Sequence, residues 1–253
     1  MKKITTTVFN FIAGALLVLI IWYICYLVLS INVLPNPVTV LMAVPGLFAN
    51  GIMVHLLHSL FRVFVALLIS MLVGLIVGTL AAGKNVVARI LTPFLYFTYP
   101  IPRVALLPAV MLIFGLSDTS KIIMITLIVV YPIIIVVRDS VKDIPKQTLN
   151  TLICYGASKA QTFFYVTLPY ALTSILSTAR ISLGTAMSIL FFTEAYGARQ
   201  GMGFFILDSW FRLNYVQMYA GIVILSILGF ALFVIIDIIE KVALKWKSSG
   251  NSS

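Results

Sequence analysis

Charged residues are scarce in this sequence. Only 9% of its 253 residues are Asp, Glu, Lys or Arg, and only seven are acidic, whereas 62% are hydrophobic. Soluble domains average about 25% charged residues, because their surfaces must be solvated by water. The composition therefore excludes a soluble globule and predicts a protein whose solvent is lipid.

The motifs of several enzyme classes are also absent. The sequence has no HExxH, no Cys/His metal spacing and no GxxxxGK[ST] phosphate loop, so we expect no catalytic residue, no metal site and no cofactor on this chain. His55 and His58 have no carboxylate nearby in the sequence and no convincing Ser or Cys nucleophile. We interpret them as an ordinary exposed pair, which disfavours a membrane hydrolase. Cys25 and Cys154 are expected to be unpaired.

Six long hydrophobic segments are present. A hydrocarbon core of ~30 Å needs ~20 apolar residues per helix, and helices pair every backbone group internally. The predicted fold is an all-α membrane protein with one domain, 1–253, and spans at about 11–31, 59–82, 92–116, 121–137, 170–195 and 217–239. A short helix from near Thr39 is expected after the first span, and Gly74 and Gly78 form a GxxxG motif that allows close helix packing.

The basic residues are distributed unequally between the two sides of these spans. One side holds Lys2, Lys3, Lys84, Arg89, Arg138, Lys142, Lys146, Lys159, Lys241, Lys245 and Lys247, and the other holds Arg62, Lys121, Arg199 and Arg212. The positive-inside rule therefore predicts that both termini are cytoplasmic. The basic residues behind the net charge of +10 then lie beside anionic membrane lipid. Nucleic-acid binding would need a basic face with exposed aromatic residues, and the sequence shows no such face.

A moderately polar loop, 143–169, separates the fourth and fifth predicted spans. Leu149, Leu152 and Ile153 form a narrow apolar stripe at i, i+3 and i+4. Gly156 is expected to end this short helix in a sharp turn. Ser158 and Gln161 have capping-box spacing, which predicts a second short helix that runs to Leu168-Pro169. A loop without any partner is the simpler alternative.

The spacing from Gly156 to Leu168-Pro169 resembles the EAA loop of permease subunits of ABC importers, EAAxxxG followed after nine residues by IxLP. The opening triplet departs from that pattern, because it reads Asn150-Thr151-Leu152 and has no acidic residue. The resemblance implies that the loop is a cytoplasmic helix-turn-helix that contacts an ATPase subunit. The residues expected at this contact are Leu149, Asn150, Leu152, Ile153, Tyr155, Gly156, Ala157 and Ser158.

Other stretches are similar to the nitrate, sulfonate and taurine branch of these permeases: Tyr99-Pro100-Ile101-Pro102-Arg103, Glu194-Ala195 and Gly201-Met202-Gly203. The resemblance implies a six-helix, type I importer permease in a bacterial inner membrane. Its implied partners are a second permease copy in a homodimer, an ABC ATPase subunit that binds ATP and Mg²⁺, an extracytoplasmic substrate-binding protein and membrane lipid.

The expected function is ATP-driven import of a small solute by alternating access. An anion such as a sulfonate, nitrate or taurine is one candidate, and a vitamin precursor is another. The alternative is an ion-coupled secondary carrier, which would need intramembrane acids. Only Glu194 and Asp237 lie near a predicted span, both close to its end, and this disfavours the carrier.

The candidate residues of the translocation pathway are Pro100, Pro102, Arg103, Arg180 and Glu194. The prolines remove backbone donors and kink the third span. Arg103 lies about 15 Å along that span from Pro93, near the midplane, where it either lines the pathway or pairs with a carbonyl or with Glu194. Arg180 is expected to reach the cytoplasmic surface or bind the loop, and Glu194 to be solvated or to act in gating near the outer end.

Overall fold

The computed structural model describes residues 2–83 and 85–244, with side chains from Ala13 onward, and no strand occurs in these ranges. The all-α prediction is therefore confirmed. The elements are α1 (Lys2–Leu29), α2 (Pro37–Ala49), α3 (Ile52–Ala82), α4 (Val86–Thr98), η1 (Arg103–Leu106), α5 (Leu107–Phe114), α6 (Asp118–Lys142), α7 (Lys146–Cys154), α8 (Lys159–Thr162), η2 (Phe163–Thr167), α9 (Leu168–Ala195), α10 (Met202–Phe211) and α11 (Tyr215–Ala243).

Helices α3, α6 and α9 form the centre of the bundle, and the largest cluster of buried apolar side chains comes mainly from them. The contact between α3 and α6 is close at both glycines of the GxxxG motif. A Cβ atom at Gly74 would lie 2.4 Å from Ile133 Cγ2, and one at Gly78 would lie 2.7 Å from Val137 Cβ. The predicted packing role of this motif is confirmed.

Four helices, α3, α6, α9 (with α8 and η2) and α11, are long and apolar enough to cross a membrane, and they contain the second, fourth, fifth and sixth predicted spans. The described apolar part of α1, Ala13–Leu29, is shorter. Helix α3 begins at Ile52 rather than near residue 59, so it carries His55 and His58 in addition to Ser59 and Arg62. Helix α2 begins at Pro37, where the Asn36 side chain accepts a hydrogen bond from the amide of Val38.

The third predicted span, 92–116, is interrupted at the prolines that predict a kink, and the interruption is a full break between two helices. Helix α4 ends at Thr98, and the segment Arg103–Phe114 leaves it at an angle of 90°. Pro100 and Pro102 explain the break, because each lacks an amide donor and each disfavours helical geometry in the residue before it. The chain resumes with one 3₁₀ turn, and Pro108 is tolerated in the first turn of α5.

The fifth span is longer than expected, because helix continues from Lys159 to Ala195 without interruption. The predicted second short helix ends at Leu168-Pro169, where α9 begins with Pro169 in its first turn, but the helical backbone does not stop there. The backbone widens to a π-helix over Phe163–Thr167, and the amide of Leu168 donates to the carbonyl of Phe163, five residues earlier. This local widening accommodates a proline inside a rod of about 55 Å.

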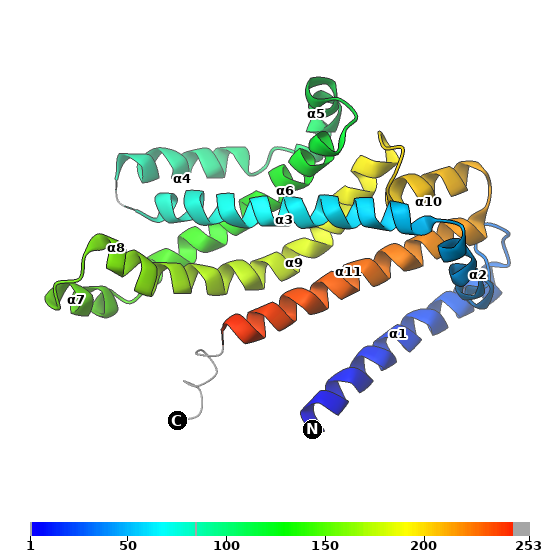
Figure 1. Cartoon of the computed structure of the whole chain (residues 1–253), viewed down its shortest axis with the longest axis horizontal. Coiled ribbons are helices and arrows are strands. Elements are labelled where there is room, and N and C mark those ends of the chain that lie inside the picture. The colour runs from blue at the N-terminus through cyan, green and yellow to red at the C-terminus, as the bar shows by residue number, and fades with distance from the viewer. Residues whose placement is uncertain (1, 84, 245–253) are drawn as a thin grey trace.

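The elements at the two ends of the bundle differ. Helices α7 and α8, the C-terminal end of α3 and the start of α4 lie at one end, whereas α2 and α10 lie at the other (Figure 1). We call these the α7 end and the α10 end. Helix α9 runs from the first to the second, so it connects the two candidate sites described below.

Candidate functional site

The turn after α7 has the backbone geometry that the sequence predicts. Gly156 has a φ of +76°, in the left-handed region, and the amide of Ala157 donates to the carbonyl of Leu152 at 3.0 Å. No atom lies within 4 Å of a Cβ built at Gly156. The glycine is therefore required by the backbone conformation of the turn and not by lack of space.

The capping box at the start of α8 is confirmed. The amide of Gln161 donates to Ser158 Oγ at 3.2 Å, and the amide of Ser158 donates to Gln161 Oε1 at 2.7 Å. These reciprocal bonds satisfy two amides that the helix itself leaves unpaired.

The residues expected to contact an ATPase fall into two groups. Leu149, Leu152 and Ala157 are half-buried, whereas Asn150, Ile153, Tyr155, Gly156 and Ser158 are exposed. Ile153 is 65% exposed and Tyr155 is 87% exposed. The sequence analysis missed Phe164 and Tyr165, which are also exposed, although their adjacent aromatic rings in a polar loop were a visible signal. We call Ile153, Tyr155, Phe164 and Tyr165 the loop patch.

Arg103 stabilises the break between α4 and α5. Its Nη2 donates to the carbonyls of Thr98 and Tyr99 at 3.1 and 3.3 Å, and its guanidinium carbon lies 3.5 Å from the ring centroid of Tyr131 on α6. The cation thus satisfies carbonyls at the C-terminal end of α4 and contacts an aromatic face. Of the alternatives considered for Arg103, pairing with a carbonyl is observed and pairing with Glu194 is not.

Arg180 makes a different contact from the one expected. It forms ion pairs with Asp237, at 3.2 Å, and with Glu240, both on α11, and Ser177 donates to the same glutamate at 2.8 Å. Contact with the loop is therefore not observed, whereas the side chain is 29% exposed and its position at the cytoplasmic surface stays a prediction. The sequence separation of its partners, 57 and 60 residues, gave no local signal for this contact.

Glu194 is fully buried, so the expectation of a solvated position is also wrong. Its carboxylate accepts hydrogen bonds from Arg62 Nη1 at 2.7 Å, from the amide of Gly203 at 2.9 Å, and from Ser59 Oγ, which is 2.8 Å from both oxygens. The physical reason is that α3 packs against α9 and places Ser59 and Arg62 opposite the end of α9.

Arg62 extends this network to α6. Its Nε and Nη2 lie 2.8 and 2.6 Å from Asp118 Oδ1, and its Nη1 also donates to the carbonyl of Gln200 at 2.8 Å. The sequence analysis placed Arg62 and Lys121 among outer charges, yet both side chains are buried.

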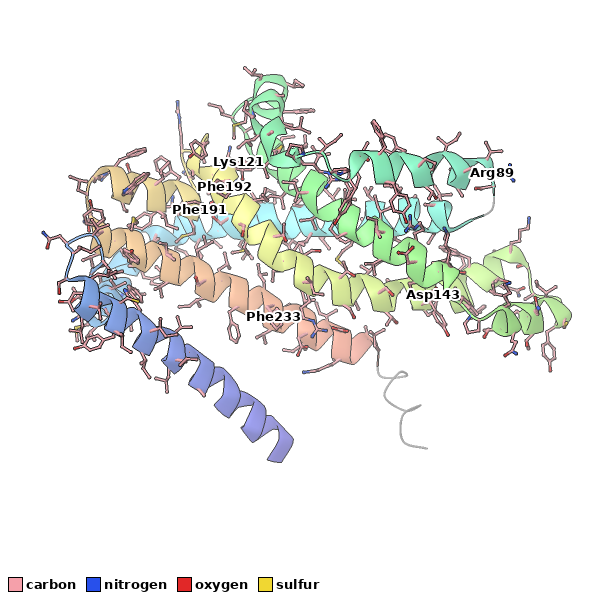
Figure 2. All side chains as sticks on the ribbon, turned by 180° about the vertical axis from the view of Figure 1, so that it is seen from behind. Arg89, Lys121, Asp143, Phe191, Phe192 and Phe233 are labelled. Carbon is pink, nitrogen blue, oxygen red and sulfur yellow. The ribbon has the colours of Figure 1, made fainter. Side chains whose placement is uncertain are left out.

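Lys121 uses all three of its protons on backbone carbonyls. Its Nζ donates to Leu116 and Ser117, each at 3.0 Å, and to Gly197 at 2.9 Å. Figure 2 shows Lys121 near the end of α9 that carries Phe191 and Phe192. We call Ser59, Arg62, Asp118, Lys121 and Glu194 the ion cluster, and its two cations and two carboxylates balance in charge.

The two histidines lie beside this cluster and are half-buried, which corrects the prediction of an exposed pair without a carboxylate. His55 Nδ1 accepts a hydrogen bond from the amide of Gly201 at 3.1 Å, and His58 Nδ1 lies 3.8 Å from Asp118 Oδ2. Across the described ranges, no three His, Cys, Asp or Glu side chains are grouped as metal ligands would be. Cys25 and Cys154 are both free thiols.

The helical fold, the broken α4–α5 pair and the buried charges define a multi-pass helical membrane protein. The family model described as "Binding-protein-dependent transport system inner membrane component" matches residues 70–245. The chain belongs to this family and is a permease of the ABC importer type, as the motifs of its sequence predict.

Named relatives agree with this family. The chain is 34% identical over 178 residues to the taurine transport system permease protein TauC of Escherichia coli (strain K12), a match that covers 70% of this chain and 65% of TauC. It is 30% identical to the aliphatic sulfonates transport permease protein SsuC of Bacillus subtilis (strain 168), over 88% of this chain and 81% of SsuC. It is 29% identical to the formylaminopyrimidine transport permease protein ThiX of Halalkalibacterium halodurans, over 92% and 93% of the two chains.

A solved structure shows the same fold. A chain from inward-facing conformations of the MetNI methionine ABC transporter superposes with a TM-score of 0.65 at 23% identity, and the match covers 75% of this chain and 94% of that chain. The secondary-carrier alternative loses its basis, because both acids that could serve it, Glu194 and Asp237, are neutralised by arginines.

Proposed function

We propose that this permease moves a small polar solute into the cytoplasm by alternating access, as one of two identical copies. ATP and Mg²⁺ bind to a separate ABC ATPase subunit, and an extracytoplasmic binding protein delivers the solute. The α7 end and both termini face the cytoplasm in this proposal. The observation that carries it is the exposed loop patch at the α7 end.

The loop patch has the chemistry of a protein interface. Tyr155 is 87% exposed, and aromatic side chains that become buried at an interface provide much of the energy of protein association. Ile153 and Tyr155 would enter a groove on the ATPase, and Leu149 and Leu152 would hold α7 in place beneath them. Asn150, Ala157 and Ser158 would complete the contact, with Gly156 setting the angle of the turn.

The continuous helix from Lys159 to Ala195 would transmit movement of this surface through the membrane. A continuous helix of this length allows a displacement at α7 to reach the α10 end without an intervening loop. The π-helical turn at Phe163–Thr167 is the irregular part of the rod and is therefore the expected place of bending.

The break between α4 and α5 is the proposed pathway surface. Pro100 and Pro102 are exposed, and irregular backbone at membrane depth is tolerated only where it contacts protein or water. Arg103 keeps a positive charge at this surface. Arg180, which is half-buried on α9, is the second proposed pathway cation, whereas Glu194 is buried and would position the outer end of α9 rather than touch solute.

The solute class follows from this charge and from the relatives. Taurine and aliphatic sulfonates carry a sulfonate group, which suits a pathway lined by Arg103. The formylaminopyrimidine named for ThiX is a neutral ring, so a vitamin precursor remains the second candidate.

Co-purification tests the proposal. We expect the tagged permease to bring down an ABC ATPase from mild detergent, and we expect Tyr155→Ala and Ile153→Ala each to reduce the amount recovered by about tenfold or more, the loss typical of an interface hot spot. Thr151→Ala is the matched control, because Thr151 is exposed on the same helix and bonds only the carbonyl of Gln147. A permease that purifies alone and moves solute in liposomes without ATP would contradict the proposal.

A further inference from the structure

The turn that joins α9 to α10, residues 197–203, is held in place by side chains from three helices. Five of its backbone groups are bonded in this way. Lys121 and Arg62 donate to the carbonyls of Gly197 and Gln200, while the amides of Gly201, Met202 and Gly203 donate to His55, Ser59 and Glu194. Loops on protein surfaces are usually the mobile parts of a fold. Five hydrogen bonds from side chains to one short turn therefore indicate that its backbone conformation is important for function.

Two glycines allow the turn to lie directly on the ion cluster. Gly201 has a φ of +128°, and a Cβ there would lie 2.4 Å from Glu194 Cδ and 2.6 Å from Arg62 Nη1. A Cβ at Gly203 would lie 2.6 Å from the carbonyl oxygen of Phe191. Any other residue type at these positions would push the turn away from the buried charges.

The pinned turn presents one free cation. Arg199 is exposed, and no hydrogen bond or ion pair joins it to another residue within the described part of the chain. It lines a cavity of about 640 Å³ together with His58, Asp118 and Gln200. Arg212, an exposed arginine just after α10, differs because it forms an ion pair with Asp208 at 2.9 Å.

We propose that this turn is a preformed docking contact for the extracytoplasmic binding protein, in which Arg199 receives an acidic side chain of that protein at the mouth of the cavity. The inference rests on the proposed function and adds the place and the chemistry of that partner's contact. A guanidinium binds a carboxylate through two parallel hydrogen bonds. Because the turn is already ordered, docking does not carry the entropic cost of fixing it.

A carboxylate on a protein suits this cavity better than the free solute does. The three protons of Lys121 are already bonded to carbonyls, and Arg62 is bonded to Asp118 and Glu194, so a small anion would find few free donors there. It would also meet the half-exposed carboxylate of Asp118. An acidic side chain is held in place by the rest of its protein surface and needs only Arg199.

The test uses the assembled importer, permease with ATPase, in lipid nanodiscs, and the purified binding protein of the same transport system. Association rates are measured at several salt concentrations, together with the stimulation of ATP hydrolysis by the binding protein. The variants are Arg199→Glu and Arg199→Lys, and the matched control is Arg212→Glu. Neither arginine belongs to the ion cluster, so we expect all three variants to assemble with the ATPase as the wild type does.

We expect Arg199→Glu to slow association by about tenfold and to weaken its dependence on salt, because charged groups at the rim of an interface act mainly on the association rate. Arg199→Lys should retain most of the rate, and Arg212→Glu should change it little. Equal association rates for Arg199→Glu and the wild type would overturn the inference. If Arg199→Glu instead alters ATP hydrolysis when solute is added without binding protein, the anion at this site is the solute, and the docking role is wrong.

Failure of the proposed function would look different. In that case the wild-type complex itself would not assemble with an ATPase, or the binding protein would not stimulate its ATP hydrolysis. A stimulated wild type with an unaffected Arg199→Glu variant separates the two outcomes.

Discussion

The two ends of the helix that runs from Lys159 to Ala195 place their polar groups in opposite environments. At the α10 end, Glu194 is fully buried and both oxygens of its carboxylate are bonded, while at the α7 end the turn around Gly156 is open and the aromatic side chains of the loop patch are exposed. Buried, fully bonded charges specify one arrangement, because any loss of a partner leaves an unpaired charge. Exposed apolar side chains leave an end free to bind another surface.

The comparison predicts the largest effect at Glu194. Glu194→Ala removes the carboxylate and leaves Arg62 buried with one partner fewer, which should lower the free energy of unfolding by about 3–5 kcal/mol. Thermal unfolding of the purified protein in detergent measures this change. Tyr155→Ala is the matched truncation at the α7 end and should change stability by less than about 0.5 kcal/mol. Equal losses for the two variants would mean that the ends do not differ in this way.

Two of the four glycines that have a positive φ in the described residues, Gly156 and Gly201, sharpen the comparison. Gly201→Ala introduces both an unfavourable φ and an overlap with Glu194, so we expect it to cost more than about 2 kcal/mol. Gly156→Ala introduces only the unfavourable φ, since nothing lies within 4 Å, and should cost about 1 kcal/mol. Both are read from the same unfolding measurement. A larger loss for the Gly156 variant would contradict the packing described at the α10 end.

A loss of stability no larger than that of Gly156→Ala is expected at Arg180, which lies between the two ends. Arg180→Gln leaves Asp237 paired with Lys241 at 2.6 Å and Glu240 bonded to Ser177. Because the arginine is also partly exposed, its loss should cost at most about 1 kcal/mol. A loss comparable to that of Glu194→Ala would show that this ion pair is as important to the fold as the ion cluster.

Local features of the fold could be predicted from the sequence because they depend on residues a few positions apart. The end of α7 at Gly156, the capping box of Ser158 and Gln161 and the close approach of α3 at Gly74 and Gly78 are of this kind. The helix boundaries were less predictable. The prolines near position 100 produced a complete break of 90° where a kink is predicted, whereas helical backbone continues through Pro169, directly after the π-helical turn Phe163–Thr167.

The partners of buried charges were the least predictable part. Glu194 is 132 residues from Arg62 in sequence, and Arg62 is 56 residues from Asp118. Each side chain taken alone has the pattern of a charge at the end of a span, which is normally solvated. An arginine and a lysine at the outer ends of two predicted spans were visible as unusual charges, but nothing in their local sequence indicated that they share one cluster.

The sequence by itself determined the lipid-solvated helical architecture, the family and the shape of the loop after α7, since composition and short spacings control solvent preference and backbone geometry. Only the tertiary structure decided which charges neutralise one another, how the α9–α10 turn is pinned and which apolar side chains remain exposed. These depend on the packing of α3, α6, α9 and α11, which brings together residues that no local pattern connects.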